Sequence, residues 1–235
     1  MKKYEINVGL LGWGTVGTGV SRILVNQNHR IYQNTGLSLK LLRIAKRTLP
    51  AYRSGIDLAG GCLTTDANAV VDDPDIEIVV ELIGGTTNSR ELILRAMQNG
   101  KSIVTANKAL IAKCGAELFQ LAQKQGVSLN FEASAAGGIP IIKTLRESFA
   151  GNQIESIYGI VNGTCNYILT EMQKNGRDFS EALEMAQGKG YAEEDPTFDI
   201  EGTDAAQKLI ILTALAHHIS VPLNRVHTEG ITKIT

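Results

Sequence analysis

Three glycines near the amino terminus have the spacing of a nucleotide-binding turn. Gly12, Gly14 and Gly17 follow the apolar segment 5–11 and precede a helical pattern. The first glycine permits a tight turn, the second lets backbone N–H groups approach phosphate oxygens, and the third allows close packing of helix and strand. The helix dipole and the unpaired N–H groups would attract a pyrophosphate without a charged side chain. A plain glycine turn is the alternative. The candidate cofactor contacts in this turn are Gly12, Trp13, Gly14, Thr15, Val16 and Gly17.

Two basic residues bear on which nucleotide is bound. The second predicted strand, 37–45, ends in Lys46 and Arg47, where a site that prefers NAD carries a carboxylate for the ribose 2′-hydroxyl. Arg binds a phosphate through two hydrogen bonds and Lys binds it as a point charge, so this pair favours NADP(H) over NAD(H). The competing interpretation is a solvated turn before Pro50.

The elements that must position these residues alternate between strand and helix through the first half of the chain. The predicted elements are strands at 5–11, 37–45, 76–83, 101–105 and 127–132, and helices from about 16, at 88–98 and at 109–125. This alternation is typical of a Rossmann-like, doubly wound α/β sheet. Ligands of such sheets lie beyond the carboxyl ends of the strands, where the sequence has Thr86 and Lys108.

The pattern changes after residue 133, where small residues and glycines interrupt the alternation. The elements predicted beyond this point are helices at 141–149, 165–173, 180–187 and from 204, and a strand at 154–161. We therefore expect two domains: a dinucleotide-binding domain at 1–133 and an α+β domain at 134–235.

Composition is that of a soluble enzyme. The 235 residues carry a formal net charge of −1 with both signs mixed along the chain, which gives no electrostatic case for binding nucleic acid or an acidic membrane surface. No apolar run reaches the ~18 residues of a membrane-spanning helix. The three cysteines are far apart and lack the spacing of a metal site, so we expect reduced thiols and a cytoplasmic protein.

Six blocks of the sequence resemble the homoserine dehydrogenases, in the same order and with similar spacing. They are GLLGWGTVGTGV, VVELIGG, VTANKAL, FEASAAGGIPI, NGTCNYILTEM and GYAEEDPTFDIEGTDAAQKL. The resemblance spans nearly the whole chain. It implies NAD(P)-dependent interconversion of L-homoserine and L-aspartate 4-semialdehyde, in the route to threonine, methionine and isoleucine. It also implies that 134–235 binds the substrate and contributes to a homodimer.

A reaction of this kind needs a group that exchanges the hydroxyl proton while hydride moves. A lysine suits the role when it is partly buried near a second cation, because both effects favour the neutral amine. Lys208 follows Asp204 by four positions, which sets both on one helix face. The resemblance implies that Lys208 exchanges the proton and that Lys108 lies by the nicotinamide and the substrate. A lysine on a helix is otherwise most often a solvated surface charge.

Acidic residues gather just before this helix and at its start. They are Glu193, Glu194, Asp195, Asp199, Glu201 and Asp204. Carboxylates pair with cations, and homoserine carries an ammonium group. The resemblance implies that Glu193 binds this ammonium and that Asp199 and Asp204 complete the polar site. A solvated, charged loop is the alternative, and we assign Glu194 to it.

A glycine-bearing segment between the two expected domains has the ligands of a hard monovalent cation. One carboxylate followed by exposed backbone carbonyls supplies only oxygen donors. The resemblance implies a sodium ion held by Glu132 and by the carbonyls of Ala135, Gly137 and Ile139. A bare interdomain turn is the alternative.

The chain ends at residue 235, where homoserine dehydrogenases continue. We therefore expect a fragment that lacks segments used to cover the cleft and to form the dimer, which puts its activity in isolation in doubt. Two other classes remain open: another amino-acid oxidoreductase, such as an aspartate dehydrogenase, and a non-catalytic NADP-binding sensor.

Overall fold

The structure is a computed structural model that describes residues 4–48 and 62–235. The chain divides into two compact units, Met1–Ser134 and Ala135–Thr235. Among the described residues, no helix is both long and apolar enough to cross a lipid bilayer.

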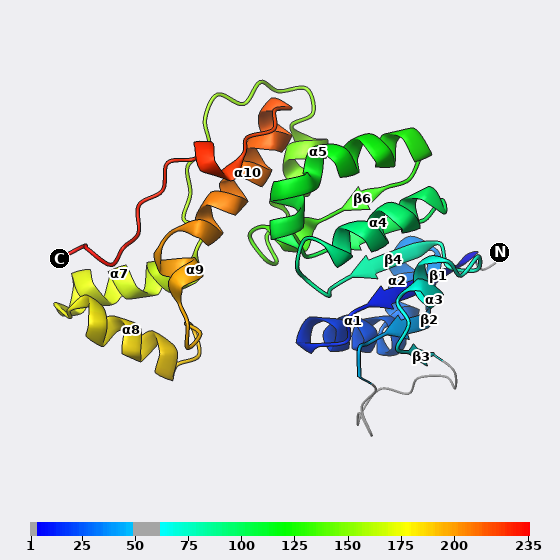
Figure 1. Ribbon diagram of the computed structural model, residues 1–235, viewed down its shortest axis with the longest axis horizontal. Coiled ribbons are helices and arrows are strands. Elements are labelled where there is room, and N and C mark those ends of the chain that lie inside the picture. Colours follow the sequence, from blue (N-terminus) through cyan, green and yellow to red (C-terminus); the bar gives the residue numbers. More distant parts are fainter. Residues whose placement is uncertain (1–3, 49–61) are drawn as a thin grey trace. The chain divides into compact units, whose positions relative to one another are not determined.

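A six-stranded parallel sheet is the centre of the first unit (Figure 1). Its strands are β1 (Tyr4–Leu11), β2 (Leu37–Ala45), β3 (Leu63–Thr64), β4 (Ile78–Glu81), β5 (Ser102–Thr105) and β6 (Leu129–Asn130). The order β3-β2-β1-β4-β5-β6 places β1 between β2 and β4, so the strand order reverses its direction there. This is the doubly wound order, and the Rossmann-like α/β prediction is confirmed.

Helices cover this sheet because each parallel pair needs a crossover connection. They are α1 (Thr15–Asn26), α2 (Asn28–Thr35), α3 (Asn68–Val71), α4 (Asn88–Gln98) and α5 (Lys108–Gln125). Helices α1 and α2 contact β2, whereas α4 and α5 pack against each other. Right-handed crossovers on either side of β1 send the two pairs to opposite faces. One cluster of the apolar core joins Val8, Leu10, Trp13, Ile44 and Val80.

Two short elements, α2 and β3, were not predicted from the sequence. Helix α2 has eight residues and none that is fully buried, and Ile31 is a partly buried residue that packs on the apolar core, so the segment carries little apolar surface by which a helix is recognised. Strand β3 has two residues, too few to show alternation. Strand β6 is also shorter than predicted, because the chain turns into a 3₁₀-helix at Glu132–Ser134.

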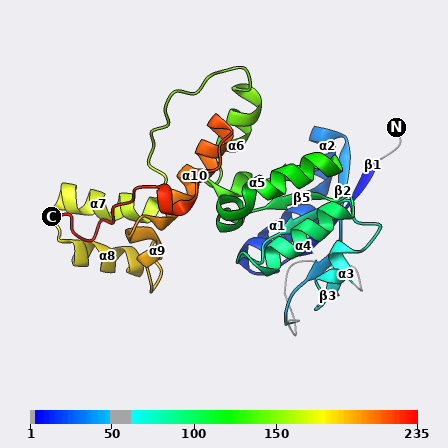
Figure 2. The ribbon, with the colours of Figure 1, turned by 45° about the horizontal axis from the view of Figure 1, so that its top comes forward.

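The second unit is helical. Its helices are α6 (Ile141–Lys143), which continues as a π-helix at Thr144–Ser148, then α7 (Gly163–Asn175), α8 (Phe179–Gly188), α9 (Thr197–Ile200), α10 (Thr203–His217) and a 3₁₀-helix at Leu223–Arg225. Helices α7 and α8 lie side by side (Figures 1 and 2) and bury an apolar cluster that includes Ile168, Ala182 and Ala186.

The strand predicted at 154–161 is not formed. Residues 153–162 have no regular secondary structure, and no strand occurs in 135–235, all of which the structure describes. The apolar residues that suggested a strand are largely in solvent: Tyr158 is 93% exposed and Ile160 is 80% exposed. A single extended segment cannot satisfy its backbone groups without a neighbouring strand, and none lies beside it here.

The turn after β1 accepts only glycine at two of its positions. Gly12 has a φ of 98°, and a Cβ built on it would lie 2.7 Å from the backbone of Leu82. A Cβ on Gly17 would lie 2.2 Å from the carbonyl oxygen of Gly12. The start of α1 is therefore pressed against the turn itself.

We expect Gly17→Ala to lower the free energy of unfolding by about 1–3 kcal/mol, because the new methyl group displaces backbone. Gly19→Ala is the matched control: a Cβ at Gly19, in the same helix, meets nothing within 4 Å. The control should raise the free energy of unfolding by about 0.5–1 kcal/mol, since alanine loses less entropy in a helix. Chemical denaturation of both variants measures this, and equal values for the two would contradict the packing argument.

Candidate functional site

The amino terminus of α1 has the features of an anion site. Gly14 is its N-cap residue, and a Cβ there would meet nothing within 4 Å, so the backbone is open to an approaching ligand. No acidic residue lies in the first turn of the helix. Thr15 and Val16 are exposed, whereas the Trp13 side chain is buried in the core, so only its backbone can face a ligand. These features suit phosphate oxygens.

The two basic residues stand next to this turn. The N–H of Gly12 donates to the carbonyl of Ala45, the last residue of β2, at 3.0 Å. Lys46 follows and is half-buried, its N–H donating to the carbonyl of Thr64 at 3.0 Å, and Arg47 is exposed. Lys46 and Arg47 are therefore the first and second residues after Ala45, whose carbonyl is bonded to the glycine turn. That is the position of the ribose 2′-substituent in a doubly wound sheet.

The loops after β4 and β5 meet beyond the same edge of the sheet. Asn107, the N-cap of α5, accepts a hydrogen bond from the Leu110 N–H at 3.1 Å and donates through its side-chain amide to the carbonyl of Gly85 at 2.7 Å. Thr86 follows in the first loop and is half-buried. Lys108 is the first residue of α5 and is also half-buried. The predicted cofactor residues of the two loops are thus held together by Asn107.

Lys208 and Asp204 form an ion pair within the second unit. The Lys208 Nζ lies 2.6 Å from Asp204 Oδ2 and also donates to the carbonyl of Val161 at 2.5 Å. The side chains are 17% and 3% exposed, respectively. The spacing of four positions predicted that Asp204 and Lys208 share one helix face, and the structure has them in contact. An ammonium has three N–H donors, and these two contacts use two of them.

Asn162 joins this pair to a second carboxylate, and sequence reasoning missed it. Its side-chain amide donates to Asp199 Oδ1 at 2.7 Å and to Asp204 Oδ2 at 2.9 Å. The Thr164 hydroxyl lies 3.2 Å from Asp199 Oδ2. Asn162 is the N-cap of α7 and sits just before it in the motif Asn-Gly-Thr, so its capping role was readable in the sequence. Its hydrogen bonds to Asp199 in α9 and Asp204 in α10 could not be read from the sequence.

Cys165 lies against the same cluster but is a poor nucleophile. Its thiol donates to the backbone carbonyl of Asp199 at 3.2 Å. Burial and then the negative charges of Asp199 and Asp204 raise the pKa of the thiol to about 11. At neutral pH it stays protonated, and the thiol is the unreactive form.

The structure does not bring Glu193 into this cluster. Both Glu193 and Glu194 are exposed in the turn between α8 and α9, where their backbone carbonyls accept from the Gln187 side-chain amide at 3.1 and 3.3 Å. The two residues have similar surroundings here, so the geometry does not separate the predicted substrate ligand from its neighbour. Of the predicted substrate residues, Asp199 and Asp204 are brought together, because both accept hydrogen bonds from the Asn162 amide.

The predicted sodium ligands straddle the division between the units. Glu132 opens a 3₁₀-helix at the end of the first unit, and Ala135, Gly137 and Ile139 follow in the second. The carbonyl of Ile139 accepts the N–H of Ile141 at 2.8 Å. One carboxylate and three carbonyls form an all-oxygen donor set of the kind that hard cations prefer. Among the described residues, no group of three or more His, Cys, Asp or Glu side chains forms a metal site.

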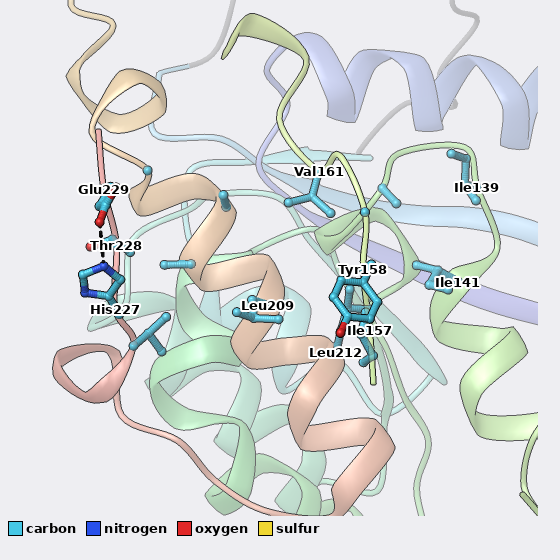
Figure 3. A pocket seen from close by; sticks show the side chains of 16 residues that line it. Ile139, Ile141, Ile157, Tyr158, Val161, Leu209, Leu212, His227, Thr228 and Glu229 are labelled. Atoms are coloured by element: carbon cyan, nitrogen blue, oxygen red, sulfur yellow. Dashed lines mark hydrogen bonds and ion pairs between the residues drawn. The ribbon is translucent and has the colours of Figure 1, made fainter. Parts of the chain in front are cut away.

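An apolar cavity of about 690 Å³ lies on a neighbouring face of α10 (Figure 3). Figure 3 shows Leu209 and Tyr158 in the middle of its lining, with Ile139 and Ile141 toward one end. His227 and Glu229, whose side chains form a hydrogen bond of 3.0 Å, lie toward the other end. Val161 links the two sites, since its side chain lines the cavity while its carbonyl accepts from the lysine of the polar cluster. A polar amino acid is better matched by the polar cluster than by this cavity.

Comparisons with known proteins point to one family. Residues 12–132 match the model "Homoserine dehydrogenase, NAD binding domain" and residues 140–235 match the model "Homoserine dehydrogenase". A homoserine dehydrogenase of Pseudomonas aeruginosa is 46% identical over 230 residues, which cover 98% of this chain and 52% of that protein. The chain spans about half the length of the curated relatives that it matches.

Solved structures agree. The crystal structure of a homoserine dehydrogenase from Thiobacillus denitrificans is 52% identical with a TM-score of 0.91, over 99% of this chain and 54% of that one. A hyperthermophilic archaeal homoserine dehydrogenase, solved in complex with NADPH, is 28% identical with a TM-score of 0.82, over 98% of this chain and 75% of that one. With matches to both family models and to these relatives over nearly all of its length, the chain belongs to the homoserine dehydrogenase family.

Proposed function

We propose that this chain provides the nucleotide site and the proton-transfer group of an NADP(H)-dependent homoserine dehydrogenase. The single observation that carries the proposal is the buried Asp204–Lys208 pair, in a chain whose other unit has a dinucleotide-binding turn. In the oxidative direction, L-homoserine loses a hydride from its hydroxymethyl carbon and a proton from its hydroxyl group, and becomes L-aspartate 4-semialdehyde. The nicotinamide, when bound, supplies the hydride acceptor.

Binding of the cofactor falls to the first unit. The open backbone at Gly14 and the amino terminus of α1 receive the pyrophosphate, and Lys46 and Arg47 receive the 2′-phosphate. The archaeal relative that was solved with NADPH supports this choice of nucleotide. Thr86 and Lys108, on the loops after β4 and β5, are the proposed contacts of the nicotinamide half.

Proton exchange falls to Lys208. Two of its N–H groups donate to Asp204 and Val161, which fixes the direction of the remaining position on the nitrogen, and this position is proposed to face the substrate oxygen. In the oxidative direction it is the lone pair of the neutral amine, which accepts the hydroxyl proton; in the reductive direction it is the N–H of the ammonium, which donates a proton to the aldehyde oxygen. Asp204 keeps the amine oriented and balances its charge during the transfer. The amide of Asn162 in turn fixes Asp204, so that the lysine has one geometry.

Recognition of the substrate ammonium is assigned to the carboxylates. Asp199 and Asp204 already face a common amide donor, and Glu193 lies on the exposed turn before them. We extend the proposal to the remaining family features: a sodium ion held by Glu132, Ala135, Gly137 and Ile139, a cytoplasmic homodimer, and a place in the synthesis of threonine, methionine and isoleucine. The all-oxygen donor set supports the first of these.

Hydride transfer tests the proposal directly. Turnover is measured in this chain and in a chimaera that continues it with the second half of the Pseudomonas aeruginosa relative. Adding L-homoserine and NADP⁺ should produce the absorbance of the reduced nicotinamide. Reduction with L-aspartate in place of homoserine would contradict the assigned substrate, and binding of NADPH without any hydride transfer would contradict the assigned reaction.

We expect the nucleotide preference to be set by Lys46 and Arg47. Replacing them by Ser and Asp removes the charge-assisted contacts to the 2′-phosphate, which should weaken NADP(H) binding by roughly 1–3 kcal/mol and leave NAD(H) binding nearly unchanged. Titration with the two reduced nucleotides measures this. Equal losses for both nucleotides would show that the pair does not read the 2′-phosphate.

We expect Lys208→Ala to lower the turnover number by roughly 10²–10⁴-fold with little change in NADPH affinity, because proton transfer acts in the transition state. Lys208→Arg should not restore the rate, since a guanidinium does not lose its proton near neutral pH. Lys174→Ala, which removes an exposed lysine at the end of α7, is the control and should keep the full rate. An Ala variant of Lys208 with normal turnover would place the proton shuttle elsewhere.

A further inference from the structure

A carboxylate with no exposed surface lies at the carboxyl end of β4. Glu81 is the last residue of the strand and is fully buried. Its Oε1 accepts the N–H groups of Ile83 and Gly84 at 2.9 and 3.1 Å, and its Oε2 accepts the hydroxyl of Thr105 at 2.6 Å. One side chain therefore holds both the loop after β4 and the end of β5.

The hydrogen bonds continue from Thr105 to the start of α5. The Thr105 oxygen accepts the N–H of Asn107 at 3.0 Å. Asn107 returns to the first loop through its 2.7 Å bond to the Gly85 carbonyl, and it caps the helix that begins at Lys108. The result is a closed circuit from Glu81 to both loops and to the residue before Lys108.

This circuit is unusual in a strand that is otherwise apolar. Val79 and Val80 of β4 are buried hydrophobic residues, and a buried carboxylate costs free energy unless hydrogen bonds satisfy it. A second glutamate, Glu77, lies one residue before the other end of β4. It is exposed, and its side chain accepts the N–H of Asn7 at 3.0 Å. The buried acid thus stands only at the edge where ligands of such sheets bind.

The circuit lies where the second half of a dinucleotide must run. The proposed pyrophosphate and 2′-phosphate sites belong to α1 and to the end of β2, on one side of the strand-order reversal at β1. A dinucleotide that crosses this reversal passes over the ends of β4 and β5. Those are the ends that Glu81 and Thr105 connect.

We propose that Glu81 is a positioning residue for the nicotinamide half of the cofactor. It fixes the backbone of the Ile83–Gly85 loop and, through Thr105 and Asn107, the starting point of Lys108. The inference rests on the proposed nucleotide binding. It predicts that the circuit governs affinity for the nicotinamide half and leaves the adenosine half alone.

Two ligands separate these halves: NADPH, and adenosine 2′,5′-bisphosphate, which contains only the adenosine part. The variant Glu81→Gln keeps the size of the side chain, but its amide nitrogen would face the Thr105 hydroxyl, whose proton then loses the carboxylate oxygen that accepts it. We expect NADPH to bind about tenfold more weakly, the scale of a disturbed hydrogen bond to a charged group, with adenosine 2′,5′-bisphosphate within about twofold of the original chain. Glu77→Gln, the control, should leave both affinities unchanged.

A second pair of variants tests the circuit at Thr105, which connects Glu81 to Asn107. Thr105→Val removes the hydroxyl at nearly constant volume and should reproduce the NADPH loss, whereas Thr105→Ser keeps the hydroxyl and should retain the affinity. Thermal unfolding is recorded for each variant. Equal weakening of both ligands, or unchanged NADPH binding in Glu81→Gln and Thr105→Val, would overturn the inference. Failure of the original chain to bind either ligand would instead contradict the proposed nucleotide site.

Discussion

The tight turn at the carboxyl end of β1 is the steric constraint on which the nucleotide unit depends. Gly12 has a left-handed backbone conformation, and a side chain there would collide with the backbone of Leu82, while the Gly12 carbonyl leaves no room for a side chain at Gly17. Its N–H is bonded to the end of β2 at Ala45. The turn therefore sets the distances from β1 to β2, to β4 and to α1 together. The open position at Gly14 is the consequence, because the packed glycines on either side hold the helix terminus toward the ligand edge.

In the second unit, an ion pair rather than a steric constraint holds the segments around the candidate site together. The ion pair of Lys208 and Asp204 is largely removed from water, where loss of one partner typically costs about 3–5 kcal/mol. The pair also binds the segment before α7 to α10, because Lys208 donates to Val161 and Asp204 accepts from Asn162. A carboxylate at this point does two things: it balances the lysine and it aims the amine. The same contacts thus serve both the packing of the unit and the proposed chemistry.

The sequence predicts an element well where the determining residues lie within that segment, and poorly where the element depends on contacts with a distant segment. Local signals were sufficient for β2, whose bounds at 37–45 match, and for α5, which begins one residue early because Asn107 caps it. They were insufficient at 154–161, where alternating apolar residues predicted a strand that has no partner strand here. Strand formation depends on a neighbour, and no pattern within one segment can report it.

The same distinction holds for the candidate site. Spacing along one helix placed Asp204 and Lys208 together, since residues four apart share a face. Asn162 and Glu81 bond to residues 42 and 24 positions away, so their roles appear only once the chain is folded. Glu193 shows the reverse case: the family resemblance assigned it to the substrate, while the structure leaves it exposed in a turn beside Glu194.

Hydrogen–deuterium exchange with and without NADPH tests the central claim most directly, that one ligand edge of the sheet receives the whole dinucleotide. NADPH should slow exchange at the amino terminus of α1 after Gly14, at Ile83–Thr87 and at Asn107–Leu110, because these backbone N–H groups lie in the loops at that edge. The amide hydrogens of α8, in the other unit, should exchange at an unchanged rate. Protection confined to other segments, or none at saturating NADPH, would contradict the account.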